Sequence, residues 1–156
     1  MLKYTNTEIV FREIPDEITL AINISGCPIH CPDCHSKELW DDIGEKLTEE
    51  TVKDLIDKNP GITCVSFMGG DNDPKEILIL AGIIKIYYPN IKVAWYSGRK
   101  TVSVSAIHLL CLDYIKTGPF IKEKGPLDNP NTNQHLYMKE ENKYVDITYK
   151  FWTNGT

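Results

Sequence analysis

The apolar run Ile18-Thr-Leu-Ala-Ile-Asn-Ile24 leads through Ser25 into Gly26-Cys27-Pro28-Ile29-His30-Cys31-Pro32-Asp33-Cys34-His35. The first run is rich in β-branched residues, which predicts a strand. The second run places three cysteines within eight residues, directly after that strand. Ligands of open α/β sheets bind beyond the carboxyl ends of strands, so this loop is the first candidate for a functional site.

Downstream of the cysteine loop, apolar runs alternate between strand-like and helix-like patterns. Strands are predicted at 62–68, 91–96 and 112–116, and helices at 48–58, 74–87 and 101–110. Residues 118–133, rich in Gly, Pro and Asn, predict a long loop, after which 134–138 and 144–149 can pair as a hairpin. The alternation predicts an α/β fold with a largely parallel sheet and an irregular C-terminal segment.

Three further strands of the predicted sheet also end in unusual loops. These loops are Gly69-Gly70-Asp71, Ser97-Gly98-Arg99 and Thr117-Gly118-Pro119. Because the carboxyl ends of parallel strands lie at one edge of a sheet, we expect these loops to meet the cysteine loop there.

Length and composition limit the class of protein. The chain has 156 residues, which fits a single domain over 1–156, and its 42% hydrophobic and 25% charged residues are typical of a soluble globular protein. The formal net charge of −5 disfavours nucleic acid as a partner. No apolar run is long enough for a membrane span, and the N-terminus has no signal-peptide pattern, so we expect a cytoplasmic protein.

The five cysteines cannot all pair in disulfides within one chain. Cys64 and Cys111 lie in apolar stretches and are expected to be small buried side chains. Cys27, Cys31 and Cys34 can bind three irons of a cubane cluster, which would leave the fourth iron open to an outside ligand. A zinc ion with His30 or His35 as fourth ligand is the competing interpretation, although so short a loop surrounds a tetrahedral ion poorly.

The spacing Cys-x3-Cys-x2-Cys after a first strand resembles the signature of the radical S-adenosylmethionine superfamily. The resemblance implies a minimal partial (β/α) barrel, a [4Fe-4S] cluster held by Cys27, Cys31 and Cys34, and S-adenosylmethionine on the open iron. Reductive cleavage of the cofactor would give methionine and a 5′-deoxyadenosyl radical, while the protein orients and shields the reactants. The resemblance assigns no catalytic side chain beyond the cluster and cofactor.

The same resemblance implies cofactor contacts. Gly69-Gly70-Asp71 is similar to the superfamily's Gly-Gly-Glu motif, with Asp in place of Glu, and glycine allows a close approach of the backbone to a ligand. Asp33 and His35 flank the last cysteine, where the backbone passes along the adenine in this superfamily. Ser97 follows the third core strand, at the place of a group near the ribose or carboxylate.

Chain length and several local runs resemble the activating protein of anaerobic ribonucleoside-triphosphate reductase. These runs are residues 31–40, where Asp33 replaces a usual Gly, Gly118-Pro-Phe-Ile121, Gly125-Pro-Leu-Asp128, and Thr132-Asn133-Gln134 followed by His135 in place of Arg. The resemblance implies abstraction of a glycine Cα hydrogen from the reductase's large subunit, with an electron donor such as flavodoxin or ferredoxin. Trp40, Phe120 and Tyr137 are candidates for docking or for core packing.

Two other classes of function stay open at this point. One is another small radical enzyme, such as a formate-lyase-type activase or a deazapurine synthase. The other is a non-enzymatic iron–sulfur carrier or zinc module, although a carrier would need a fourth thiolate that the loop does not offer.

Overall fold

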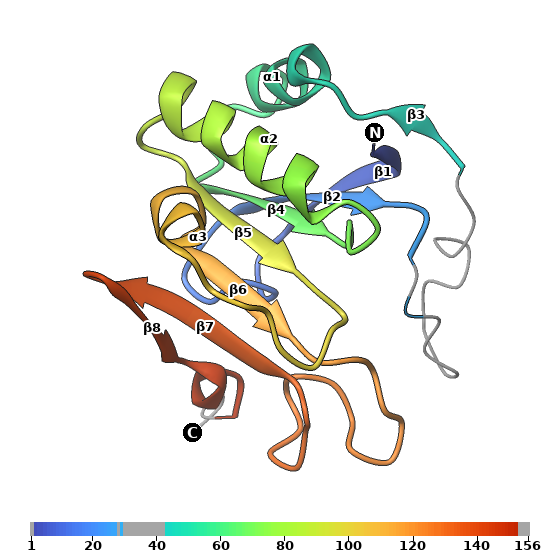
Figure 1. Ribbon diagram of the computed structural model, residues 1–156, viewed down its shortest axis with the longest axis vertical. Helices are drawn as coiled ribbons and strands as arrows, with labels where there is room; N and C mark the ends of the chain where they lie inside the picture. The colour runs from blue at the N-terminus through green and yellow to red at the C-terminus, as the bar shows by residue number, and fades with distance from the viewer. Residues whose placement is uncertain (1, 28, 30–42, 153–156) are drawn as a thin grey trace.

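The structure is a computed structural model, which describes residues 2–27, 29 and 43–152 (Figure 1). In this part of the chain, eight strands form one sheet in the order β3-β1-β2-β4-β5-β6-β7-β8. The strands are β1 (Lys3–Val10), β2 (Thr19–Ile24), β3 (Glu45–Lys46), β4 (Cys64–Met68), β5 (Lys92–Tyr96), β6 (Tyr114–Thr117), β7 (His135–Glu140) and β8 (Lys143–Asp146). The helices are α1 (Glu49–Asp57), α2 (Pro74–Tyr87), α3 (Ala106–Cys111) and the 3₁₀ helix η2 (Thr148–Phe151).

The centre of the sheet confirms the predicted alternation of strand and helix. Strands β2, β4, β5 and β6 are parallel neighbours, and their arrowheads point to one edge in Figure 1. Helices α1 and α2 begin where the sequence predicts. The Thr48 side chain caps α1, and Asp73 caps α2 ahead of Pro74 in its first turn.

The outer parts of the sheet correct the expectation of a largely parallel sheet. Only three of the seven strand pairs are parallel, because β1, β3, β7 and β8 all join antiparallel. A direct turn explains the β7–β8 pair, because it returns the chain beside the preceding strand, whereas a parallel neighbour needs a long crossover. The predicted C-terminal hairpin is confirmed: β7 and β8 pair antiparallel over 135–140 and 143–146, close to the predicted 134–138 and 144–149, and they extend the sheet. A partial-barrel closure is not confirmed, and β3 and β8 are the two edge strands.

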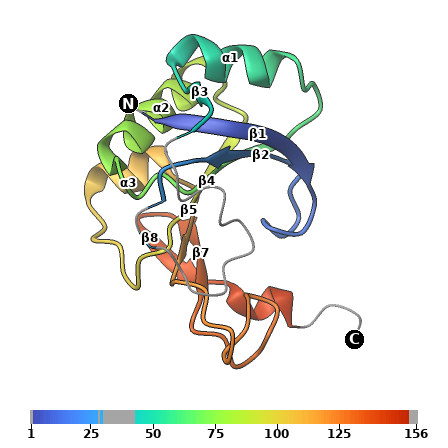
Figure 2. The same cartoon turned by 90° about the vertical axis from the view of Figure 1, so that its right-hand side faces the viewer.

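The sheet is covered differently on its two faces. The larger core packs α1 and α2 on one face and includes Val52, Ile77, Leu80, Phe67 and Trp95. The smaller core lies on the other face, where segments outside the helices α1–α3 bring Ile14, Leu127 and Ile147 onto Cys64, Ala94 and Leu136. Figure 2 shows α2 and α3 on one side and the turn between β1 and β2 on the other.

Helix α3 is shorter than predicted. It spans six residues, Ala106–Cys111, whereas the sequence pattern predicts a helix over 101–110. The β-branched residues Val102 and Val104 disfavour helix, and Ser105 starts the helix, with its backbone N–H donating to Nδ1 of His108 at 3.3 Å. Residues 99–105 therefore form a loop beside β6.

Within the described residues, no helix is long and apolar enough to cross a bilayer.

Candidate iron–sulfur site

The carboxyl ends of the four parallel strands meet at one edge, as the sequence predicts. Asn23 pairs with Met68, Met68 with Tyr96, and Tyr96 with Lys116, so the four strands end almost level. The loops that follow therefore start side by side. The residues that follow β2, β4 and β5, including the Gly-Gly-Asp and Ser-Gly-Arg loops, start at this edge (Figure 1).

The cysteine loop is closed at its base. Ser25, the residue after β2, is buried, and its hydroxyl donates to the carbonyl of Ile43 at 2.5 Å. Its backbone N–H donates to the carbonyl of Lys3 at 2.9 Å. Residues 25 and 43 are thereby held together, so both ends of the loop are fixed to the sheet edge.

Cys27 is a half-buried free thiol two residues beyond this anchor. That placement suits a cluster ligand, because the thiol is neither sealed in the core nor paired in a disulfide. The other predicted ligands, Cys31 and Cys34, and the predicted cofactor contacts Asp33 and His35 lie outside the described residues. Trp40 lies outside them as well.

The two glycines after β4 have backbone conformations that other residues rarely adopt. Gly69 has φ +109° and Gly70 has φ +93°. A Cβ on Gly70 would lie 2.5 Å from the side chain of Ile77, and one on Gly69 would lie 3.2 Å from the carbonyl oxygen of Ile24. The fold itself therefore requires glycine at both positions, and their predicted contact with the cofactor stays a prediction.

Asp71 joins the second loop to the third. Its side chain is 2% exposed, and its Oδ1 accepts a hydrogen bond from the Ser97 hydroxyl at 2.5 Å. Its Oδ2 accepts from the backbone N–H of Gly98 at 2.8 Å. Arg99 completes the contact by donating from Nη2 to the backbone carbonyl of Asp71 at 3.0 Å. Two predicted cofactor contacts, Asp71 and Ser97, are thus bonded to each other.

The third loop touches the cysteine loop directly. A Cβ on Gly98 would lie 2.9 Å from Cγ1 of Ile29, so any larger side chain would push Ile29 and its loop away. Asp71 holds Gly98, and Gly98 supports Ile29. The Asp71 carboxylate therefore acts, through Gly98, on the position of Ile29.

A buried lysine, Lys116, lies near the carboxyl end of β6, and the sequence did not predict it as a site residue. The ammonium of Lys116 donates to the carbonyls of Ser97 at 3.1 Å and Gly118 at 2.8 Å. Gly118 also donates its backbone N–H to Arg99, and Gln134 donates its side-chain amide to the Gly118 carbonyl at 3.4 Å. A lone lysine at the end of an apolar strand was the available signal, and the sequence could not show which carbonyls it reaches.

The remaining two cysteines differ from Cys27. Cys64 lies fully buried in β4, as predicted, and burial raises the pKa of its thiol far above the usual range. Cys111 is only half-buried, at the end of α3, where burial again raises the pKa of its thiol. Cys64 is the first residue of β4 and Cys111 precedes β6, so both lie toward the amino ends of these strands, whereas Cys27 follows the carboxyl end of β2.

A cysteine loop after the carboxyl end of β2 is a candidate site for a metal or an iron–sulfur cluster. Residues 18–137 match the family described as "4Fe-4S single cluster domain". This match covers most of the chain, so the protein belongs to that family, whose cluster is the cofactor expected at this site. No curated protein and no solved structure matches the chain. A 4Fe-4S domain is compatible with an oxidoreductase.

Proposed function

We propose that this protein is a radical S-adenosylmethionine enzyme, and that Cys27, Cys31 and Cys34 hold three irons of a [4Fe-4S] cluster. The observation that carries the proposal is the Cys-x3-Cys-x2-Cys spacing placed directly after β2, at the edge where three other strand-end loops meet. Membership of the 4Fe-4S family supports the cluster. Cys27 is positioned for that role, half-buried and unpaired.

The cluster together with S-adenosylmethionine would supply the radical that abstracts a hydrogen atom. The chain's own residues would shape and shield the site. Gly69 and Gly70 turn the backbone at the sheet edge, while Asp71 and Ser97 hold the loop that supports Ile29. Asp71 and Ser97 would then serve the cofactor mainly by fixing these loops.

We further propose that the hydrogen atom comes from a glycine Cα of anaerobic ribonucleotide reductase. The support is the resemblance of the C-terminal runs to the activating protein of that reductase. In the structure, two of these runs contact each other: a Cβ on Gly118 would lie 3.0 Å from the Asn133 carbonyl oxygen. Gln134 is buried at the same edge of the sheet as the cysteine loop. The substrate would then be a protein loop approaching this edge.

The test is transfer of a radical to the partner. Anaerobically reconstituted protein, S-adenosylmethionine, reduced flavodoxin and the large reductase subunit are mixed, and the subunit is examined by electron paramagnetic resonance. We expect a glycyl radical doublet together with 5′-deoxyadenosine, and neither with the Cys31→Ala/Cys34→Ala variant.

The other functions give different results in the same experiment. Formation of 5′-deoxyadenosine without a glycyl radical would indicate another small radical enzyme. A reduced cluster that never cleaves the cofactor would indicate an electron carrier.

A further inference from the structure

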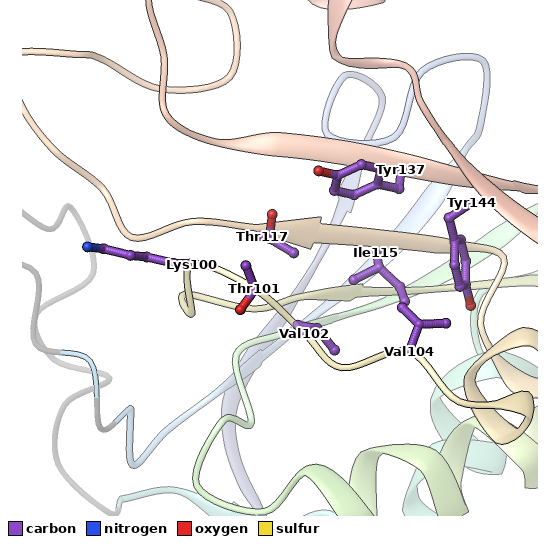
Figure 3. Close-up of a pocket in the computed structure, with 8 residues that line it drawn as sticks. All are labelled: Lys100, Thr101, Val102, Val104, Ile115, Thr117, Tyr137 and Tyr144. Atoms are coloured by element: carbon purple, nitrogen blue, oxygen red, sulfur yellow. The ribbon is translucent and has the colours of Figure 1, made fainter.

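A hollow lies on the face of the sheet that carries the helices. It has a volume of about 210 Å³ and is formed by the 100–104 loop together with β6, β7 and β8 (Figure 3). It exists because residues 99–105 are not helical. A helix over 101–110 would have changed this wall, whereas the extended loop leaves part of the sheet face uncovered.

The hollow has an apolar end. Val102, Val104 and Ile115 line it there, and the ring of Tyr144 closes it (Figure 3). The Tyr144 hydroxyl points away and donates to the carbonyls of His108 at 2.7 Å and Leu112 at 2.9 Å. Because that hydroxyl is already bonded, the Tyr144 ring presents only an apolar surface to an occupant.

The opposite end is polar. Thr101, Thr117 and Tyr137 bring hydroxyl groups to it, and Lys100 extends from it (Figure 3). Burial raises the pKa of Tyr137, so its hydroxyl stays neutral and able to donate at physiological pH. Among the described residues, no carboxylate forms an ion pair with Lys100.

A carboxylate does lie near this end, on β8. Asp146 faces Tyr137 across the β7–β8 pair. It already accepts from the backbone N–H of Thr148 at 2.9 Å and lies 3.0 Å from Nδ1 of His135. Although burial opposes it, the hydrogen bonds from Thr148 hold the pKa of Asp146 below its usual range, so Asp146 stays ionised. Lys100 is then the positive charge that a ligand carboxylate would pair with at the mouth of the hollow.

We propose that this hollow is a binding site for a small molecule with a flat apolar body and one carboxylate. The volume leaves room for roughly ten non-hydrogen atoms at the packing density of protein interiors. An apolar wall with a few polar groups at one end is the usual design of a small-ligand site. The apolar body would pack on Ile115 and the Tyr144 ring, and the carboxylate would meet the hydroxyls and Lys100.

A molecule bound in this hollow would also stabilise the loop next to the cluster site. Lys100, the first residue of this wall, lies three residues after Ser97. The Ser97 hydroxyl donates to the Asp71 carboxylate. A ligand that orders residues 100–104 therefore orders the loop that supports Ile29. Binding at this hollow does not depend on the proposed radical chemistry, so the two proposals can fail separately.

The test compares three probes on the cluster-loaded protein under anaerobic conditions by isothermal titration calorimetry. Phenylacetate carries both features, phenylacetamide lacks the charge, and acetate lacks the apolar body. We expect phenylacetate to bind, phenylacetamide to bind roughly fivefold more weakly, and acetate not to bind. Lys100→Met should remove the difference between the first two probes, whereas Lys122→Met, an exposed control in the 118–133 loop, should preserve it.

Two further variants locate the site. Val104 is half exposed, so Val104→Trp can fill the hollow without entering the core, and it should weaken phenylacetate at least tenfold. If the Val104→Trp variant does not fold, Thr117→Val serves as the test instead. Thr117→Val keeps the shape of the side chain and removes one hydroxyl, and it should weaken phenylacetate binding about threefold. Absent binding, equal binding of phenylacetate and phenylacetamide, or binding indifferent to these variants would each overturn the proposal.

Discussion

At the scale of single residues, Asp71 shows how one carboxylate can fix two loops. The sequence predicts a contact with a bound cofactor, on the analogy of a Gly-Gly-Glu motif. In the structure, both carboxylate oxygens accept hydrogen bonds from the Ser97–Gly98 segment. The sequence placed Asp71 at the correct edge of the sheet. It could not show this partner, which lies 26 residues away along the chain.

Replacing Asp71 should therefore destabilise the fold. Asp71→Ala leaves the Ser97 hydroxyl and the Gly98 N–H without their acceptor in a buried site, so we expect a loss of about 3 kcal/mol in the free energy of unfolding. Urea denaturation monitored by circular dichroism measures it. The exposed control Asp128→Ala should change stability by less than about 0.5 kcal/mol. An Asp71→Ala protein as stable as the wild type would show that the carboxylate does not hold the loop.

The cysteines offer a matched pair of substitutions. Cys27→Ala should lose most of the iron and sulfide taken up in anaerobic reconstitution, because it removes one of three ligands. Cys64→Ala should keep the full iron content and lose only about 1 to 2 kcal/mol of stability, since this thiol is buried in β4. Iron analysis and the visible absorption of the cluster distinguish them. Loss of iron in the Cys64 variant alone would reverse the ligand assignment.

At the scale of elements, the starts of α1 and α2 were predicted correctly, because each follows a capping residue that the sequence shows. Thr48 and Asp73 both cap the helices that their positions indicate. Helix α3 is shorter than the predicted 101–110, because the β-branched residues Val102 and Val104 disfavour helix at its start. Strand β1 was missed altogether. Most of its side chains are half-buried or exposed, and its sequence therefore lacks the apolar run that revealed the core strands.

Removing the N-cap of α1 tests how much the capping side chain stabilises the fold. The Thr48 hydroxyl accepts from the Thr51 backbone N–H at 3.2 Å. Thr48→Ala should lower the free energy of unfolding by about 1 kcal/mol, because that N–H would lose its partner. Ser103→Ala, in the exposed 99–105 loop, serves as the control in the same urea titration. Equal midpoints for the two variants would contradict the cap.

A buried carboxylate joins three elements and should make stability depend on pH. Asp113, next to β6, pairs with Lys85 of α2, lies 3.5 Å from the Lys139 ammonium of β7, and accepts from the Val93 N–H of β5 at 2.9 Å. Burial alone would raise the pKa of Asp113. The hydrogen bonds from Lys85 and Val93 and the two positive charges outweigh it, so this pKa lies below its usual range.

The sign of the effect follows from that direction. A folded-state pKa below the unfolded value of about 3.9 means that the stabilisation is complete above pH 3.9 and is lost as the pH falls through the folded-state value. Asp113→Asn should cost about 3 kcal/mol at pH 7, and the difference from wild type should shrink as the pH falls below 4. Urea titrations from pH 7 to pH 2 measure this, with Asp54→Asn as the exposed control. A difference that stays constant down to pH 2 would contradict the assignment.

At the scale of the whole molecule, the sequence predicted the edge where the strand-end loops meet better than the outer strands of the sheet. The four parallel strands and the convergence of their loops follow from local patterns of apolar runs and turns. Of the antiparallel flanks, the C-terminal hairpin was predicted, whereas β1 was not, because its half-buried and exposed side chains give no apolar run. The Asp71–Ser97 and Lys116–Ser97 hydrogen bonds join residues far apart in the chain, which no local pattern encodes.

The measurement that tests the central claim most directly is electron paramagnetic resonance of the reduced, anaerobically reconstituted protein, with and without S-adenosylmethionine. A three-cysteine cluster leaves one iron open to an outside ligand. The account therefore predicts a reduced [4Fe-4S] signal that changes on adding the cofactor, with 5′-deoxyadenosine in the same sample. A cluster signal that the cofactor leaves unchanged, or a protein that takes up zinc and no cluster, would contradict it.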